Sequence, residues 1–292
     1  MSGGRLRLGE RLDRHTSWRV GGPADRFYMP QDFADLHYFL HHFAVPPIHW
    51  LGLGSNLLVR DGGLRGTVIC FAHGLQRMEL AEPDLIVAEA GVGAVKLAHF
   101  AARAGLAGAE FLAGIPGTLG GCLAMNAGAH GSETWQRVEW VETLSPTGEL
   151  RRLPPTAFRI AYREVQGLGP DCFVRAALRL TADEPGAVQA RLRAGQERRA
   201  ATQPLEWPSC GSVFRNPPGD YAARLIEAAG LKGRRIGDAE VSPQHANFIV
   251  NRGAARATQI EALVQEVQDE VRRRFEVVLI PEMRVIGEDD DV

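Results

Sequence analysis

Lysine is almost missing from this sequence of 292 residues. Only Lys96 and Lys232 occur, and arginine takes the other basic positions. Neither lysine lies in a GxxxxGK[ST] pattern, which excludes the phosphate-binding loop of a Walker-type ATPase. The 33 basic residues are balanced by 35 acidic ones, a formal charge of −2, so the chain as a whole offers no basic surface to a polyanion. No nucleic-acid partner is expected.

Cysteine is also scarce, and the spacing of the cysteines indicates neither a disulfide framework nor a metal site. The four residues form no CxxC pair and no Cys/His spacing of a zinc site, and a chain of this length does not depend on disulfides. They are Cys70, Cys122, Cys172 and Cys210. The basic residues at the start are followed by no apolar core of a signal peptide. The sequence therefore predicts a reduced, cytoplasmic protein.

Neither a metal site nor a membrane partner is indicated. His41 and His42 follow apolar residues at an expected helix end, where the helix dipole favours histidine, and we find no partner at ligand spacing. The longest uncharged run, residues 111–132, is 22 residues long but contains Pro116 and six glycines. Loop backbone facing lipid would leave its N–H and C=O groups unsatisfied, so this run predicts a buried glycine-rich segment.

Hydrophobic spacing predicts a mixture of helices and strands. Apolar residues at helical spacing follow the candidate cap Asp32, which predicts a helix up to residue 43, and a second helix is expected over 95–104. The sequence from Thr258 to Glu261 has the pattern of a capping box and predicts the start of a long amphipathic helix. Residues 277–280 are typical of a last strand. The fold class expected is therefore α+β, with a domain boundary near Gln203.

Two glycine clusters are candidates for an anion site. Gly52-Leu53-Gly54-Ser55-Asn56 lies between two strand-like runs, with no room for the helix that a dinucleotide fingerprint requires. The second cluster runs from Gly114 to Gly121 and includes Thr118. Such loops let backbone N–H groups converge on a pyrophosphate, but the alternative is that both are tight turns packed against neighbouring backbone. The sequence alone leaves this choice open.

Other polar residues carry little signal by themselves. Ser212 follows a glycine in an unusual segment that ends at Pro217-Pro218, yet GxSxG is absent, and its spacing favours a turn hydroxyl bonded to local backbone. Arg163 and Glu282 taken singly are typical of ordinary ion-paired or surface residues.

Taken together and in order, these segments closely resemble the UDP-N-acetylenolpyruvoylglucosamine reductase family. The resemblance covers nearly the whole chain, and any single motif is weaker than the ordered set. The matching segments are residues 16–24, 51–56, 113–121, 125–128, 162–163, 211–217, 225–231, 246–251 and 281–282.

The resemblance implies an α+β fold with a two-subdomain FAD-binding region of the vanillyl-alcohol-oxidase/p-cresol-methylhydroxylase type and a C-terminal α+β substrate-binding domain. The expected FAD-binding subdomains are 1–75, joined by a C-terminal strand in 279–292, and 76–203. The substrate-binding domain is expected over 204–278. The implied activity is the NADPH-dependent reduction of UDP-N-acetylglucosamine enolpyruvate to UDP-N-acetylmuramate through non-covalently bound FAD, in peptidoglycan synthesis. We expect a monomer with a small UDP-sugar substrate.

The resemblance also implies residue roles. Ser212 would donate a proton to the α-carbon, while Arg163 and Glu282 would stabilise the negative charge formed there. Substrate contacts are expected from Tyr162, Arg215 and Asn216. The expected cofactor-binding residues are Gly52, Gly54, Ser55, Asn56, Gly114, Ile115, Pro116, Gly117, Thr118, Gly120, Gly121 and Asn126.

Some positions depart from the family pattern. Val165 stands where we expect a serine, and Ile280 where a glutamate often precedes Pro281-Glu282. No tyrosine lies between Tyr162 and Tyr221, which suggests the shorter subtype without a tyrosine-bearing substrate loop. Two alternatives stay open: another flavin oxidase or dehydrogenase of the same fold, and a non-catalytic nucleotide-sugar-binding protein.

Overall fold

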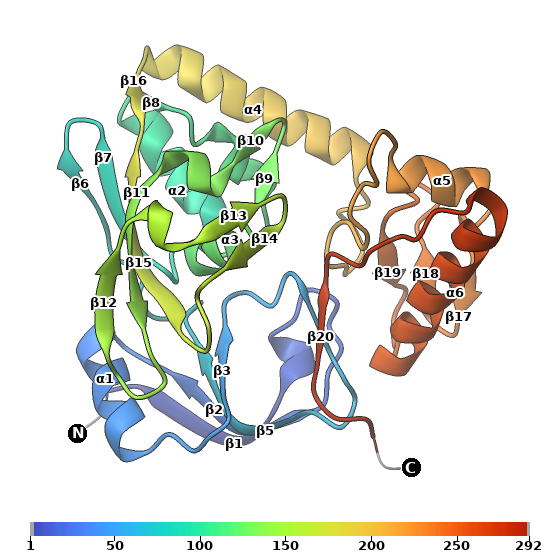
Figure 1. Ribbon diagram of the computed structural model, residues 1–292, viewed down its shortest axis with the longest axis horizontal. Coiled ribbons are helices and arrows are strands. Elements are labelled where there is room, and N and C mark those ends of the chain that lie inside the picture. The colour runs from blue at the N-terminus through green and yellow to red at the C-terminus, as the bar shows by residue number, and fades with distance from the viewer. Residues whose placement is uncertain (1–2, 291–292) are drawn as a thin grey trace. The chain divides into compact units, whose positions relative to one another are not determined.

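The computed structural model describes residues 3–290 and divides the chain into two units, each built from separate stretches of sequence (Figure 1). Unit 1 comprises Met1–Arg7, Arg26–Leu53 and Gly66–Arg199, and unit 2 comprises Leu8–Asp25, Gly54–Arg65 and Ala200–Val292. The ends of the expected segments 1–75 and 279–292, at residues 1–2 and 291–292, lie outside the described residues. The three expected domain ranges stay a prediction.

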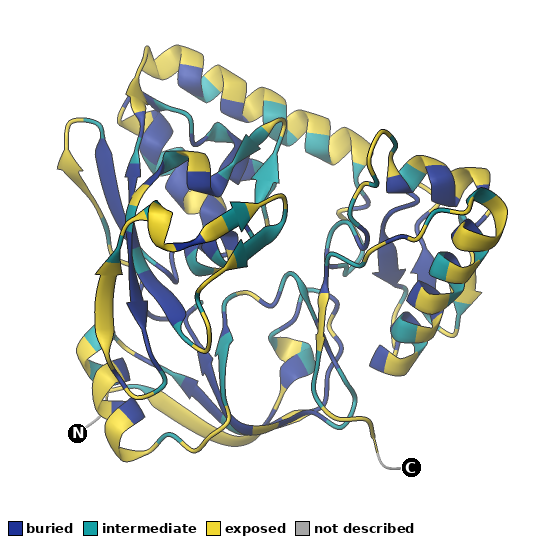
Figure 2. Ribbon diagram, in the orientation of Figure 1, coloured by how far each residue is buried: buried dark blue, intermediate teal, exposed yellow. Residues whose placement is uncertain are grey.

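A five-stranded antiparallel sheet forms the centre of unit 1. Its order is β12-β11-β15-β7-β6, with bounds Leu150–Leu153, Val138–Leu144, Cys172–Arg179, Leu85–Glu89 and Met78–Glu82. The helices α2 (Ala94–Arg103) and α3 (Leu119–Ala124) cover one face of this sheet (Figure 1). Apolar residues of β7, β11 and β15 are buried beneath them, whereas the edge strands β6 and β12 are mostly exposed in Figure 2.

The helix α1 (Phe33–His42) begins as the sequence predicts. The Asp32 carboxylate accepts a hydrogen bond from Asp35 N at 2.9 Å, so the expected cap is confirmed. Leu36 and Phe39 are fully buried and pack with Tyr28, whose ring stacks on Phe39 at a centroid distance of 3.6 Å. This small core lies beside β3 (Ile48–Leu51), which pairs in parallel with β5 (Leu64–Cys70).

Unit 2 has its own core around the long helix α6 (Ala257–Phe275). Figure 2 shows α6 buried along one side and exposed along the other. The buried side includes Ile260, Leu263 and Val267, which pack with residues of α5 (Ala222–Ala228). A three-stranded antiparallel sheet completes this core, with β17 (Arg235–Ile236), β18 (Ala239–Val241) and β19 (Ile249–Asn251) in that order.

Two sequence predictions in unit 2 are wrong. Thr258 does not cap α6, because the helix begins at Ala257 and an acceptor from a distant loop takes the capping role. Residues 277–280 form no strand, because their backbone makes only isolated contacts, such as the bonds from Arg215 N to Ile280 O and from Gln268 Nε2 to Leu279 O. The last strand is β20 (Arg284–Ile286), which pairs in parallel with β4 (Leu57–Val59).

The remaining elements are short or lie at the unit boundary. They are β1 (Arg5–Arg11), β2 (Pro23–Met29), β8 (Leu106–Ala107), β9 (Gly128–Ala129), β10 (Ser132–Glu133), β13 (Arg159–Ala161), β14 (Glu164–Gln166), β16 (Thr181–Ala182) and α4 (Pro185–Thr202). The strands β1, β2, β5 and β3 form a sheet in that order. None of the helices within residues 3–290 is both long and apolar enough to cross a membrane.

Candidate functional site

The second glycine cluster lies in unit 1 and is held by main-chain bonds to the segment that precedes α2. Gly117 O accepts from Ala94 N at 2.9 Å, and Gly120 N donates to Ala90 O at 2.9 Å. Thr118 is the N-cap of α3, and its hydroxyl accepts a bond from Gly121 N at 3.4 Å. The loop is therefore fixed by its own backbone, with Ile115 half-buried and Pro116 exposed.

The glycines of the two clusters fall into two physical classes. A Cβ on Gly52 would lie 2.5 Å from Thr118 Oγ1, and one on Gly120 would lie 3.0 Å from Ala90 Cβ, so packing inside unit 1 requires both glycines. Gly114 and Gly121 differ, because their Cβ positions meet nothing closer than 3.9 Å and 3.7 Å. Open Cβ positions before α3 and in its first turn suit the close approach of a phosphate group.

Asn126 and Arg163 form a connected pair in unit 1. The buried Asn126 has a φ of +42°, and its side chain donates to Glu133 Oε2 at 2.8 Å and Ala161 O at 3.1 Å, and accepts from Trp135 N at 3.2 Å. These bonds fix the position of Asn126, whose backbone carbonyl helps to orient Arg163. Arg163 donates to Asn126 O at 3.4 Å and to Gly128 O at 2.7 Å.

Tyr162 lies next to this pair at the tip of the β13–β14 hairpin. Its side chain is 46% exposed, and the Arg163 guanidinium carbon lies 4.9 Å from its ring centroid. Val165 pairs with Ile160 across the hairpin, so the position expected to be a serine is filled by an apolar cross-strand contact. Arg163 itself has a φ of +56°. This costly conformation for an arginine is typical of a functional position.

The first glycine cluster continues into unit 2. A Cβ on Gly54, whose φ is +60°, would lie 2.2 Å from His15 O, so this glycine serves a close backbone approach. The neighbouring Ser17 has a buried hydroxyl with no hydrogen-bond partner among the described residues. Ser55 is half-buried between Gly54 and Asn56.

Unit 2 brings Ser212, Asn56 and Glu282 into one backbone network. Glu282 N donates to Val213 O at 2.7 Å, which places the Glu282 backbone beside the residue that follows Ser212. Asn56 Nδ2 donates to Glu282 O at 3.1 Å. Gly211, with a φ of +84° and an open Cβ position, leaves space on the other side of Ser212.

The two expected substrate residues of unit 2 follow directly in the chain. Asn216 Oδ1 accepts from Ala222 N at 3.1 Å, so this side chain supports the start of α5. Arg215 N donates to Ile280 O at 2.9 Å, which ties the loop to the segment before Glu282. The buried Cys210 thiol lies near the Glu282 carboxylate, and burial first and that charge second raise its pKa above the usual range.

Sequence reasoning missed Asn247, the residue that holds the Ser212 loop (residues 211–217). Asn247 is buried, accepts from Phe214 N at 3.0 Å and donates to Phe214 O at 2.8 Å. It lies in the matching segment 246–251, which is the signal that could have identified it. The histidine search also overlooked His37, whose Nε2 lies 3.2 Å from His41 Nε2 on α1. Among residues 3–290, no group of three or more His, Cys, Asp or Glu side chains is arranged to hold a metal ion.

The features described here fit a phosphate-bearing cofactor such as FAD. In unit 1, Gly114 and Gly121 leave open Cβ positions at the two ends of the second glycine cluster, Gly121 in the first turn of α3. In unit 2, the Ser17 hydroxyl is a buried polar group that the described chain does not satisfy, and buried polar groups in proteins are almost always hydrogen-bonded.

Comparisons with known proteins agree with these features. Residues 29–154 match the FAD binding domain family, and residues 203–286 match the family described as UDP-N-acetylenolpyruvoylglucosamine reductase, C-terminal domain. The UDP-N-acetylenolpyruvoylglucosamine reductase of Alkalilimnicola ehrlichii is 56% identical over 98% of this chain and 96% of its own. The protein of the same name from Methylococcus capsulatus is 54% identical over 96% and 92%.

A solved structure is also similar. The crystal structure of UDP-N-acetylenolpyruvylglucosamine reductase (MurB) from Thermus caldophilus is 35% identical to this chain. It covers 97% of this chain and 98% of its own, with a TM-score of 0.83. The expected α+β class, with an FAD-binding region followed by a separate C-terminal domain, is confirmed.

Proposed function

This chain belongs to the UDP-N-acetylenolpyruvoylglucosamine reductase family, and from that premise we propose that it reduces UDP-N-acetylglucosamine enolpyruvate to UDP-N-acetylmuramate with NADPH. It is an FAD-containing oxidoreductase of peptidoglycan precursor synthesis. The observation that carries this function is the 56% identity to a named reductase over 98% of the chain. The match of residues 29–154 to an FAD binding domain supports the cofactor.

FAD is held without a covalent bond by the two glycine clusters. Gly114 and Gly121 would let the FAD phosphates approach the backbone closely, and Thr118, Ser55 and Asn56 would add polar side chains. Gly52, Gly54 and Gly120 keep the loops close-packed, Gly117 O accepts a bond from Ala94 N, and Ile115, Pro116 and Asn126 lie within or just after the second cluster. When bound, FAD supplies hydride transfer between NADPH and the enolpyruvyl group.

The proton of the reaction comes from Ser212. Hydride addition to the β-carbon of the enolpyruvyl group leaves an electron pair and negative charge at the α-carbon and its carboxylate, and the Ser212 hydroxyl gives its proton to that carbon. Arg163 and Glu282 stabilise the charge. The bond from Glu282 N to Val213 O supports this assignment, because it places Glu282 next to the serine loop.

The substrate is held by Tyr162, Arg215 and Asn216. Tyr162 presents a half-exposed ring at a hairpin tip, and Asn216 keeps its amide nitrogen for a ligand while its oxygen accepts from Ala222 N. The UDP-sugar is the small-molecule partner. We propose that the enzyme acts as a monomer. We also propose that it works in the cytoplasm, which the four buried free cysteines support.

The visible spectrum of purified protein tests this function. Flavin bands should bleach when NADPH is added without oxygen and return when UDP-N-acetylglucosamine enolpyruvate follows. Acid precipitation should release the flavin into the supernatant. A protein that cannot be loaded with FAD, or whose reduced flavin is not reoxidised by that substrate, would contradict the proposal, and flavin retained in the precipitate would point to a covalent flavin oxidase.

A further inference from the structure

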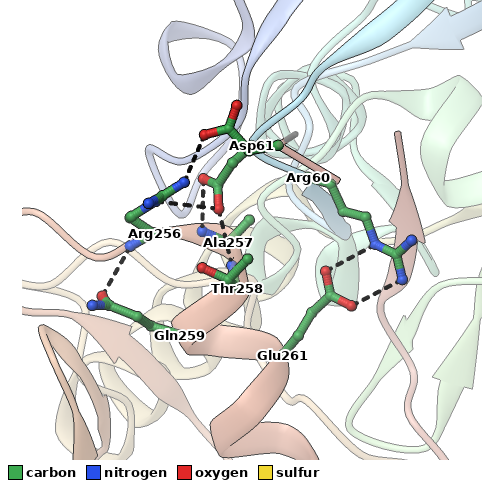
Figure 3. Close-up of polar contacts among 8 residues, drawn as sticks. Arg60, Asp61, Arg256, Ala257, Thr258, Gln259 and Glu261 are labelled. Atoms are coloured by element: carbon green, nitrogen blue, oxygen red, sulfur yellow. Dashed lines mark hydrogen bonds and ion pairs between the residues drawn. The ribbon is translucent and has the colours of Figure 1, made fainter. Parts of the chain in front are cut away.

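The start of α6 is capped by a loop that lies 196 residues earlier in the chain. The Asp61 carboxylate accepts from Ala257 N at 3.1 Å and from Thr258 N at 3.2 Å (Figure 3). The residue just before the helix is Arg256, whose side chain has no acceptor and lies 3.6 Å from the same carboxylate. Asp61 thus satisfies two of the unpaired N–H groups at the helix start with a favourable charge.

The residue before Asp61 makes a second attachment one turn further along the helix. Arg60 Nε and Nη2 donate to the two carboxylate oxygens of Glu261 at 3.0 Å and 3.1 Å (Figure 3). Such a two-bonded Arg–carboxylate pair fixes orientation as well as distance. Consecutive loop residues therefore hold consecutive turns of α6, which restrains the loop against both sliding and rotation.

This loop directly follows β4 and is also bonded to the strand that leads back to Glu282. Arg60 N donates to Ile286 O at 2.9 Å, and Gly62 N donates to Glu288 O at 3.0 Å. β4 and β20 pair in parallel from Leu57–Arg284 to Val59–Ile286. The bonds from Arg60 and Asp61 to α6 thus help to fix how β4 is aligned with β20.

The residues that precede β4 and β20 include Asn56 and the candidate catalytic residue Glu282. Arg284 N donates to Asn56 O at 3.0 Å, Asn56 Nδ2 donates to Glu282 O at 3.1 Å, and Glu282 N donates to Val213 O at 2.7 Å. A path of hydrogen bonds and short stretches of chain therefore runs from the Arg60–Asp61 loop to Val213 O, in the peptide that joins Val213 and Phe214.

We propose that Asp61, assisted by Arg60, is a positioning residue for Glu282 and the Ser212 loop. This inference rests on the proposed function, because Glu282 and Ser212 matter only for the step that consumes the enolpyruvyl substrate. Loss of the Asp61 carboxylate frees β4 to shift against β20. The shift moves Asn56 and Glu282 while the glycine loop of unit 1 keeps its own bonds.

The test compares Asp61→Ala with a matched cap variant, Asp32→Ala, in the FAD-loaded full chain. Asp32 caps α1 in unit 1 through Asp35 N and has no bond to the β4–β20 pair. Stopped-flow absorbance without oxygen measures flavin reduction by NADPH and reoxidation by the enolpyruvyl substrate separately. We expect Asp61→Ala to slow reoxidation about tenfold or more and to leave reduction within about twofold. Asp32→Ala should leave both rates unchanged.

Two further variants keep the test decisive. Asp61→Asn retains an acceptor oxygen and should recover part of the reoxidation rate. Glu261→Gln, a milder change, serves if Asp61→Ala does not fold, and should slow reoxidation more than reduction. Equal loss of both half-reactions, or unchanged rates with only a lower melting temperature, would overturn the positioning role. Wild-type reduced flavin that the substrate cannot reoxidise would instead overturn the proposed function.

Discussion

The glycine loop of unit 1 (residues 114–121) and the Ser212 loop of unit 2 are held in place by different kinds of bonds. The glycine loop is held by backbone bonds to residues 90–94, about thirty positions away or less. The Ser212 loop is held by an asparagine side chain at 247 and by backbone at 280–282. The first arrangement tolerates side-chain change except where a Cβ would clash, whereas the second depends on particular distant residues.

The largest effect expected from this difference comes from Ser212→Ala. Removal of the hydroxyl eliminates the proposed proton donor, so reoxidation by the enolpyruvyl substrate should slow by roughly 10²–10⁴-fold, a typical contribution of general acid catalysis. Reduction by NADPH should be nearly unchanged, because that step needs no proton at the α-carbon. Single-turnover stopped-flow absorbance measures both rates.

The control for this prediction is the neighbouring serine in the same segment. Ser209→Ala removes a hydroxyl from a position with no assigned role, and both half-reactions should match those of the wild type. If Ser212→Ala slowed reduction and reoxidation equally, the proton would come from elsewhere and the serine would support the loop only.

Two buried asparagine side chains, one in each unit, give the next largest effect. Asn247→Ala should lower the free energy of unfolding by about 2–3 kcal/mol, because it leaves Phe214 N and O unsatisfied in a buried place. It should also slow reoxidation by displacing the Ser212 loop. Asn126→Ala should cost a similar free energy in unit 1, through its three lost bonds and its φ of +42°.

Urea unfolding and the two half-reactions together decide whether this comparison holds. Asn126→Gly serves as the matched control, because glycine tolerates the positive φ and should recover about 1 kcal/mol relative to Asn126→Ala. If Asn247→Ala lowered stability without slowing reoxidation, the side chain would be needed for folding but not for placing Ser212.

The same difference explains how much could be predicted from the sequence. Local signals were sufficient for two helices: Asp32 caps α1 as expected, and α2 forms within one residue of the range predicted over 95–104. The long helix was expected, but its cap was assigned to Thr258, because a pattern search looks within a few residues. The true acceptor, Asp61, is distant in sequence and reaches the helix only through the tertiary fold.

The strand predicted over 277–280 does not form, for a related physical reason. Val278 and Ile280 are 62% and 58% exposed and Leu279 is buried, so the segment alternates as a strand does. Alternation indicates an extended backbone, yet a strand also needs a partner along its length. The backbone contacts here are isolated: Arg215 N to Ile280 O, Gln268 Nε2 to Leu279 O, and the adjacent Phe214–Pro281 bridge. For the site, the glycine positions were visible in the sequence, whereas Asn247 and the bond between Asn56 and Glu282 were not.

A smaller effect should separate the two classes of glycine. Gly121→Ala places a methyl group where space is open and should leave the stability of the cofactor-free protein unchanged or raise it by about 0.5–1 kcal/mol. It should weaken FAD binding, because the methyl group occupies the proposed phosphate approach. Gly120→Ala meets Ala90 Cβ at 3.0 Å and should instead lower stability by about 1–3 kcal/mol.

Thermal unfolding of the cofactor-free protein and a fluorescence titration with FAD measure the two quantities independently. Should Gly121→Ala bind FAD as the wild type does, the open Cβ position would not face the cofactor and the loop would be a structural turn.

The smallest expected effect is a change of stability with pH, and it concerns only the unit 2 residues that support the Ser212 loop. Burial lowers the pKa of His245, whose Nδ1 accepts from Asn247 N at 3.3 Å and whose ring contacts Phe248. Because the folded state holds this proton less tightly than the unfolded state, the unfolded state binds more protons just below its ordinary pKa of about 6.5. Stability should therefore fall slightly as the pH decreases from about 7 to about 5, and His245→Asn should remove that part of the slope. Urea midpoints of both proteins across this range test the prediction, and parallel pH profiles would show that His245 protonation does not weaken the support of the Ser212 loop.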